Sequence, residues 1–155
     1  MANADKIDLP DVTLTGASGA PLSLRDYLGA PFVLYFYPKD DTPGCTREAQ
    51  DFSAHYADFR AAGAELLGVS LDTPTKHGKF AAKYDLTVPL ATDADKAAMG
   101  ALGVWIEKSL YGRKYMGIDR STFMFDAAGT LVRDWRKVKV AGHVAAVLDA
   151  VRSAR

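Results

Sequence analysis

The hydrophobic pattern of this chain contains two mostly apolar runs that are too short for buried helices. Residues 32–37 are an unbroken apolar run between prolines, and residues 65–71 form a second run rich in leucine and valine. Both runs predict strands that are buried on their two faces. Residues 11–15 instead alternate between apolar and polar positions, which predicts a half-buried strand, and the glycines of 16–19 predict a turn after it.

A helix that begins near Pro43 is predicted between the two buried strands. Its apolar residues recur at spacings of three and four and so form one stripe, at Ala49, Phe52, Tyr56 and Phe59. Gly63 is placed to end this helix as a C-terminal cap. Two buried strands joined by a helix predict a βαβ unit with a right-handed crossover.

The rest of the chain gives shorter signals. We expect a helical turn at 24–28, a helix from Thr73–Pro74 to Tyr84, an edge segment at 88–90, a short helix from Asp93 to Leu102, a loop at 104–118, strands at 122–125 and 131–138 that form a hairpin, and a last helix at 144–151. This order predicts a thioredoxin-like α/β fold, with a central mixed sheet flanked by helices, as one domain over residues 1–155.

Composition and charge exclude some classes of function. The 155 residues are 48% hydrophobic, and 19 basic residues balance 19 acidic ones, so no net charge recruits nucleic acid or an anionic membrane. No apolar run is long enough to span a bilayer, and the first residues lack the apolar stretch of a secretory signal. The single cysteine excludes an intrachain disulfide, and we expect a cytoplasmic location.

That cysteine, Cys45, is the main candidate for chemistry. A lone cysteine is usually an inert core residue, but Cys45 follows the loop 38–44 at the start of a predicted helix, where amide groups and the helix dipole favour a thiolate. We expect Thr42 to cap the helix, to accept from the Cys45 amide and to donate its proton to the sulfur. Gly44 leaves room for a small molecule, and Pro38 stiffens the loop and shields one side.

A thiolate in this position needs a nearby cation. Lys39 is close in sequence, but we expect its side chain to point to solvent. Arg120 directly precedes a predicted strand that can bring it to the same edge of the sheet. Spacing alone does not choose Arg120 over Arg113 or Arg47.

The segment Pro38-Lys39-Asp40-Asp41-Thr42-Pro43-Gly44-Cys45-Thr46 resembles the P-x-x-x-T-x-x-C motif of the peroxiredoxins, in the branch of the bacterioferritin comigratory proteins (PrxQ). The resemblance extends from about residue 9 to 148 and includes segments 103–109 and 117–120. It implies that Cys45 is the peroxidatic cysteine, with Thr42 as hydroxyl partner, Pro38 as shielding proline and Arg120 as site arginine.

The resemblance also implies the reaction. A Cys45 thiolate would reduce hydrogen peroxide or an organic hydroperoxide and become a sulfenic acid. Gly44, Cys45, Thr42 and Arg120 would bind the substrate, and no cofactor or metal is expected. The resemblance to this branch also implies that the protein is a monomer.

One residue departs from that branch. Many members carry a second cysteine in a C-T-x-x-A-C pattern, but Gln50 stands at that position here. We therefore expect a one-cysteine mechanism in which thioredoxin, glutaredoxin or glutathione reduces Cys45. Glu48 either orients Arg120 or Arg47, or is an ordinary solvated helix residue.

Two other classes of function remain open at this point. A cysteine hydrolase needs a base beside its nucleophile, and a catalytically idle thioredoxin-like binding module needs no reactive thiol. The histidines at His55, His77 and His143 show no metal-binding spacing, and we expect surface or helix-end roles for them.

The remaining candidates have structural interpretations of equal or greater weight. Trp105 and Tyr111 either line a pocket or serve in packing. A basic cluster on the last hairpin is expected to protect a strand edge and consists of Arg133, Arg136, Lys137 and Lys139.

Overall fold

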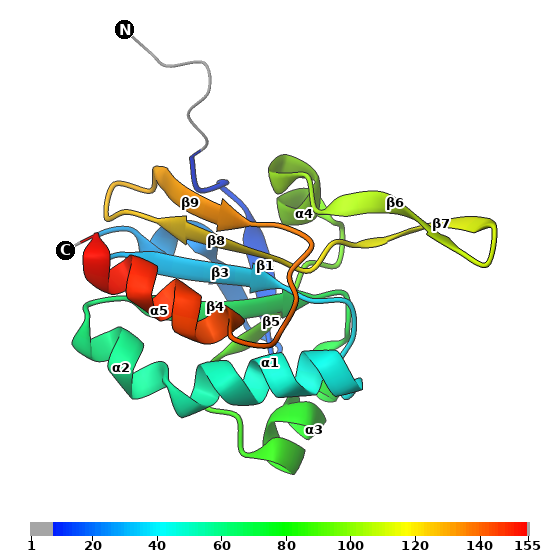
Figure 1. The fold of residues 1–155 in the computed structure, drawn as a ribbon, viewed down its shortest axis with the longest axis horizontal. Helices are drawn as coiled ribbons and strands as arrows, with labels where there is room; N and C mark the ends of the chain where they lie inside the picture. The colour runs from blue at the N-terminus through cyan, green and yellow to red at the C-terminus, as the bar shows by residue number, and fades with distance from the viewer. Residues whose placement is uncertain (1–7, 155) are drawn as a thin grey trace, which may run out of the picture.

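The computed structural model describes residues 8–154 and centres on a mixed sheet with helices on both faces (Figure 1). The strands of this sheet are β1 (Thr13–Gly16), β2 (Pro21–Ser23), β3 (Phe32–Phe36), β4 (Glu65–Ser70), β5 (Leu90–Thr92), β8 (Ser121–Phe125) and β9 (Leu131–Trp135), in the order β2-β1-β5-β4-β3-β8-β9. The helices are η1 (Leu24–Tyr27, 3-10), α1 (Pro43–Ala54), α2 (Tyr56–Ala61), α3 (Pro74–Tyr84), α4 (Ala97–Leu102) and α5 (His143–Ser153). The predicted fold class is confirmed.

Two pairings of β3 place the candidate site. The strand runs parallel to β4, with Phe32 opposite Glu65, so the predicted βαβ unit is present and α1 belongs to its crossover. On its other side β3 runs antiparallel to β8, with Phe36 opposite Ser121. The last residue of β3 therefore lies beside the first residue of β8, at one end of these strands. Arg120 directly precedes β8, so it lies near the loop that follows β3 and leads to Cys45.

The sheet separates two apolar cores. Val33 and Tyr35 of β3 point into the core beneath α1, α2 and α5, while Leu34 and Phe36 point into the core beneath α4 and η1. Because side chains alternate along a strand, both faces of β3 are buried, which explains its unbroken apolar sequence.

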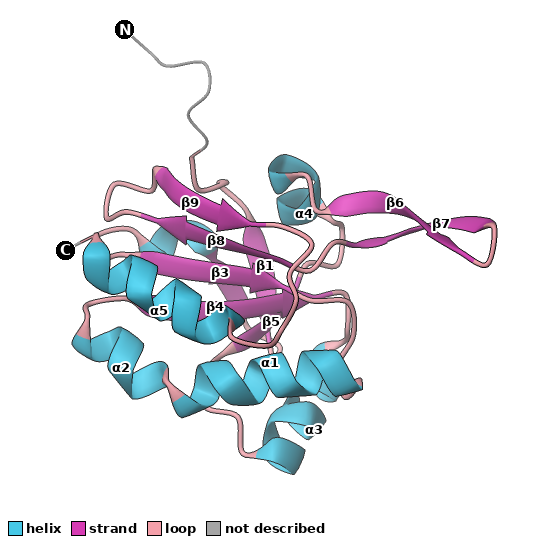
Figure 2. Cartoon of the chain, viewed as in Figure 1, coloured by secondary structure: helices cyan, strands magenta, loops and turns pink. Residues whose placement is uncertain are grey.

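The predicted loop at 104–118 is wrong. This segment forms the antiparallel hairpin of β6 (Trp105–Leu110) and β7 (Arg113–Ile118), which stands apart from the main sheet (Figure 2). Most of its side chains are exposed on both faces, so no apolar alternation marks the strands. The signal in the sequence that could have indicated the hairpin is Gly112 between the two strands. In the structure Tyr111 and Gly112 form the turn, with positive φ angles of 51° and 77°.

One smaller prediction is also wrong, and one pairing was not predicted. The short segment at 88–90 was expected at an edge, but β5 covers 90–92 and lies inside the sheet, between β1 and β4. Its three residues are too few for a pattern that distinguishes an edge from an interior position. The pairing of β2 with β1 was not predicted, because β2 has only three residues. Within residues 8–154, no helix has the length and apolar character needed to cross a membrane.

Candidate functional site

Cys45 is the third residue of α1 and is only 2% exposed. Thr42 is the N-cap residue in extended conformation, and Pro43 takes the first helical position, as the sequence predicts. The sulfur faces the interior beside Ala49, which is also buried. The thiol is thus sheltered from solvent.

The expected hydrogen bond between the Thr42 side chain and the Cys45 amide is absent among the described residues. Instead, the Thr42 hydroxyl donates to the carbonyl oxygen of Lys39 at 2.7 Å. Asp41 has a left-handed backbone with φ of 60°, which turns the loop back on itself and brings that carbonyl within reach. A hydroxyl has one proton, so the Thr42 proton is committed to the loop and is not directed to the sulfur.

Arg120 is the cation that the fold brings to Cys45. Its Nη2 group donates to the Cys45 sulfur at 3.2 Å. A Cβ atom on Gly44 would lie 3.1 Å from this same Nη2, so glycine allows the guanidinium its close approach. The other two candidates lie elsewhere: Arg47 is exposed on α1, and Arg113 begins the outer strand β7.

Glu48 holds the other side of this guanidinium. Its carboxylate is fully buried and accepts from Arg120 Nη1 at 2.8 Å, which makes it a partner of Arg120 rather than a solvated residue. Its Oε2 atom has no hydrogen-bond partner among residues 8–154. Burial raises the pKa of Glu48 to about 7, and the attraction of Arg120 offsets this burial only in part. One arginine thus spans a buried carboxylate and the cysteine sulfur.

The raised pKa of Glu48 leads to a pH prediction. The folded protein binds this proton more tightly than the unfolded chain, whose glutamate titrates near 4.5, so ionisation of Glu48 lowers stability as pH rises from 4.5 to 7. Glu48→Gln keeps an acceptor for Arg120 but does not titrate. We expect the stability of wild type relative to Glu48→Gln to fall by up to about 3 kcal/mol over this interval and then to level off.

Urea denaturation of both proteins at a series of pH values measures that difference. A difference that stays constant or grows in favour of wild type between pH 4.5 and 7 would contradict the prediction.

Tyr35 lies beneath the site and was not singled out from the sequence. Its ring stacks on Phe52 at 4.4 Å, and its hydroxyl is buried without a partner among the described residues. Burial raises the pKa of Tyr35 well above its usual range, and the charges of Glu48, Asp40 and Cys45 act in the same direction. The hydroxyl therefore stays neutral. The signal in the sequence that could have identified Tyr35 is a tyrosine within an apolar run. A buried tyrosine hydroxyl usually has a hydrogen-bond partner, so its presence in a core strand suggests a role beyond packing.

A second buried cluster anchors the loop before Thr42. Tyr37 donates to one oxygen of Asp40, and the Nδ1 atom of His77 lies 2.8 Å from the other. The amide of Asp40 donates to Asp72 at 2.8 Å. A surface or helix-end role was expected for His77, which is wrong: it is fully buried in α3, because its partner Asp40 comes from a loop far away in sequence.

The other two histidines differ from each other. His143 begins α5, as expected for a helix-end residue, but it is buried, and its Nε2 atom lies 2.8 Å from the Thr122 hydroxyl. Burial and then the charge of Arg120 lower the pKa of His143 to about 4, so it is neutral at pH 7. His55 is exposed beside Asp58, as predicted. Among residues 8–154 no group of histidine, cysteine and acidic side chains could hold a metal ion.

The remaining candidates do not line the site. Tyr111 is 97% exposed at the tip of the β6–β7 hairpin, and Trp105 packs against the core beneath α4 with the Lys96 ammonium 5.0 Å from its ring. The basic cluster lies along β9, which is an edge strand, and beyond its end. One of its members does more than charge the edge, since Arg136 donates to the carbonyl oxygens of Leu102 and Gly103 and joins β9 to α4.

Known proteins resemble this chain over nearly its whole length. The model of the AhpC/TSA family matches residues 7–133. Peroxiredoxin Bcp of Bacillus subtilis is 47% identical over 143 residues, which are 92% of this chain and 91% of that protein. The structure of the Xanthomonas campestris bacterioferritin comigratory protein, studied for its alkyl peroxide reduction activity, has a TM-score of 0.90 and 45% identity, covering 96% of this chain and 97% of that chain.

Xanthomonas campestris Peroxiredoxin Q has also been solved as two different cysteine-to-serine mutants, each 45% identical to this chain. That protein therefore has at least two cysteines, whereas this chain has one.

Proposed function

The chain belongs to the AhpC/TSA family, and we propose that it is a thiol-dependent peroxidase that reduces hydrogen peroxide and organic hydroperoxides at the Cys45 sulfur. The observation that carries this proposal is the partly buried contact of 3.2 Å between Arg120 Nη2 and that sulfur. A guanidinium is always charged, so this contact places a fixed positive charge and a hydrogen-bond donor beside the sulfur. The thiolate is the form of cysteine that attacks peroxides.

In the proposed reaction the Cys45 thiolate attacks one oxygen of the hydroperoxide. A sulfur–oxygen bond forms, the oxygen–oxygen bond breaks, and the leaving oxygen takes a proton and departs as water or an alcohol. Sulfur is oxidised to the sulfenic acid and the peroxide is reduced. Negative charge moves toward the leaving oxygen, where Arg120 and the amide groups at the start of α1 are placed to receive it.

The loop residues would bind the peroxide. Because the Thr42 hydroxyl donates its proton to the Lys39 carbonyl, its lone pairs are free to accept from the hydroperoxide O–H. Gly44 leaves space next to Arg120, and half-buried Pro38 would shield one side of the reacting sulfur from water. These roles of Thr42, Gly44 and Pro38 are part of the proposal.

The oxidised Cys45 must be reduced by a thiol from outside the chain. Cys45 is the only cysteine, and Gln50 is exposed on α1 and has no redox chemistry. We propose a one-cysteine cycle with a thiol of the thioredoxin, glutaredoxin or glutathione kind as reductant. A reducing cytoplasm, which maintains such thiols, fits this cycle.

The hydrolase alternative has less support. It needs a histidine or another base at the nucleophile, but His77 pairs with Asp40 and His143 contacts Thr122. The idle binding module is also disfavoured, since a structural cysteine has no need of a buried arginine–glutamate pair at its sulfur.

Trapping the first intermediate tests the proposed function. The purified protein is treated with one equivalent of hydrogen peroxide and then with a reagent specific for sulfenic acids, and the modified residue is identified by mass spectrometry. We expect labelling at Cys45 and steady peroxide consumption when a thiol is supplied, with Cys45→Ser as the inactive control. A Cys45 thiol that stays unmodified after minutes with peroxide would exclude the peroxidase.

A further inference from the structure

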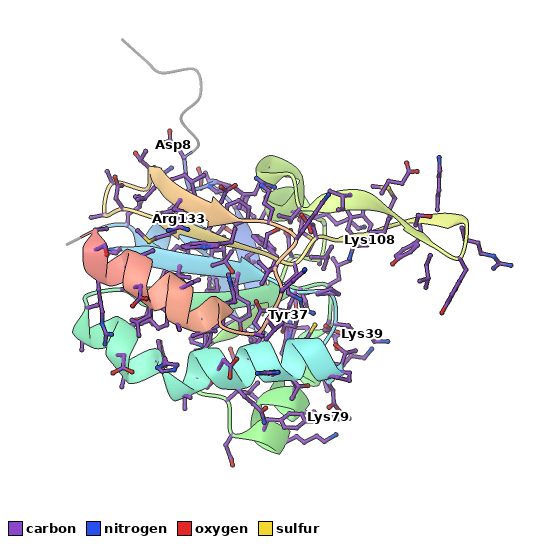
Figure 3. The ribbon with its side chains drawn as sticks, in the orientation of Figure 1. Asp8, Tyr37, Lys39, Lys79, Lys108 and Arg133 are labelled. Carbon is purple, nitrogen blue, oxygen red and sulfur yellow. The ribbon has the colours of Figure 1, made fainter. Side chains whose placement is uncertain are left out.

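A cavity lined by lysines opens beside the loop that leads to Cys45. It measures about 260 Å³, and we call it the lysine pocket; its lining residues are Lys39, Asp40, Asp41, Asp72, Lys76, Lys79, Phe80 and Lys83. Four of these residues lie on α3 and share one helix face, because they are separated by three or four positions or are adjacent: Lys76, Lys79, Phe80 and Lys83. Figure 3 labels Lys39 beside the start of α1 and Lys79 on α3, on the same side of the molecule.

The carboxylates of this pocket already have partners. Asp40 is held by Tyr37 and His77, and Asp41 pairs with Lys83 at 2.8 Å. Asp72 accepts from the Asp40 amide and from the Ser70 hydroxyl.

Three lysines of the pocket lack such partners. Lys39, Lys76 and Lys79 are exposed, and among residues 8–154 none has a carboxylate within 4.0 Å. Four lysines and three aspartates line the pocket, so positive charge exceeds negative charge by one and an anion is favoured at the unpaired lysines.

The floor of the pocket is apolar. Buried Phe80 lines it, and the long side chains of the lysines add their hydrocarbon stems. A cavity of about 260 Å³ is slightly smaller than most ligand sites, which begin at about 300 Å³. Its chemistry therefore suits a small organic molecule that carries carboxylates on an apolar or peptide framework.

The pocket is also close enough to serve the reactive sulfur. Asp41 lines the pocket and precedes Cys45 by four residues, so their backbones are at most about 14 Å apart. A bound tripeptide spans about 10 Å, so a peptide held on the lysines can cover most of that distance.

We propose that the lysine pocket binds the carboxylates of a small acidic peptide thiol, of the size and charge of glutathione, which reduces oxidised Cys45. This inference rests on the proposed peroxidase function and names the chemical class of its reductant. The thiol of the acidic peptide attacks the sulfenic sulfur of Cys45 and a disulfide bond forms between them. The sulfur–oxygen bond breaks, and the sulfenic oxygen takes the proton of the attacking thiol and leaves as water. A second thiol then attacks the mixed disulfide, releases the oxidised dimer of the reductant and restores the Cys45 thiol.

The test measures the reduction step by itself. Cys45 is first oxidised with one equivalent of hydrogen peroxide, and its reduction is followed in stopped flow with glutathione, with neutral 2-mercaptoethanol and with cationic cysteamine. The variant Lys76→Gln/Lys79→Gln removes two unpaired lysines of the pocket. Lys108→Gln/Lys114→Gln on the exposed hairpin removes the same charge elsewhere and is the matched control.

We expect the pocket variant to be reduced by glutathione about tenfold more slowly, with its rates for 2-mercaptoethanol unchanged and the control variant like wild type. Added salt should slow the wild-type reaction with glutathione and have little effect on the pocket variant. No change with glutathione, or an equal loss with all three thiols, would overturn the inference.

The same variants separate a second possible occupant. A carboxylate-bearing hydroperoxide has the same anionic chemistry as the acidic thiol. If the pocket variant slows oxidation by a fatty-acid hydroperoxide but not by cumene hydroperoxide, and reduction by glutathione is unaffected, the pocket serves the substrate and the inference is wrong. Failure of the proposed function looks different, since wild-type Cys45 would then not be oxidised in the first step.

Discussion

Replacing Arg120 with methionine should slow the oxidation of Cys45 by hydrogen peroxide about 100- to 1,000-fold. Methionine has a similar length but no donor and no charge, so the sulfur loses its hydrogen bond and the negative charge that develops on the leaving oxygen loses its stabilisation. The Arg120 side chain is only 17% exposed, so water does not readily replace its contact of 3.2 Å with the sulfur. The loss would appear in the second-order rate constant for oxidation, measured by stopped flow.

Arg47→Met is the matched control for this prediction. Arg47 lies on the same helix, two residues after Cys45, but it is exposed. We expect its oxidation rate to remain within about twofold of wild type, because screened surface charges act weakly. Arg120→Lys should be intermediate, since one ammonium cannot reproduce the fork that holds Glu48 and the sulfur together. Equal rates for Arg120→Met and Arg47→Met would contradict the electrostatic role.

Gly68→Ala should destabilise the protein by about 2 to 3 kcal/mol, although the change is a single methyl group. Gly68 lies in β4, opposite Tyr35 of β3. A Cβ atom there would lie 2.5 Å from Cζ of the Tyr35 ring and 2.9 Å from Cδ2 of Leu90, well inside van der Waals contact. The Tyr35 ring is held between this strand and Phe52, so it has little room to move.

Gly100→Ala is the control for that substitution. Gly100 lies in α4, and a Cβ atom there meets no other atom within 4 Å. We expect this variant to be more stable than wild type by about 0.5 to 1 kcal/mol, because alanine favours the helix. Urea denaturation gives both values. If Gly68→Ala were as stable as Gly100→Ala, the close packing of Tyr35 against β4 would be refuted.

Local patterns were enough to predict most of the elements that build the site. The apolar run at 32–37 and the Thr42–Pro43 start signal each depend on neighbouring residues, and each is present in the structure. The single helix predicted from Pro43 to Gly63 is wrong in one respect, because it is divided at His55 into α1 and α2. The choice of Arg120 over Arg113 and Arg47 came from the family resemblance alone. In the structure it follows from the pairing of β3 with β8, which no local pattern contains.

Most of the predictions that were wrong concern contacts between segments that are distant in sequence. The burial of His77 depends on Asp40 from a distant loop, and the interior place of β5 depends on strands on both sides of it. The Thr42 hydroxyl was assigned to the wrong partner because the left-handed turn at Asp41 is set by the folded loop. The β6–β7 hairpin was missed since its strands contribute little to either core.

The partnership of Cys45 and Arg120 spans 75 positions of the chain. During synthesis the cysteine leaves the ribosome long before the arginine is made, and the two meet only after β8 has docked against β3. Until then the sulfur lacks its charged hydrogen-bond donor. The arrangement that the proposed reaction with peroxide needs is therefore completed only together with the finished fold.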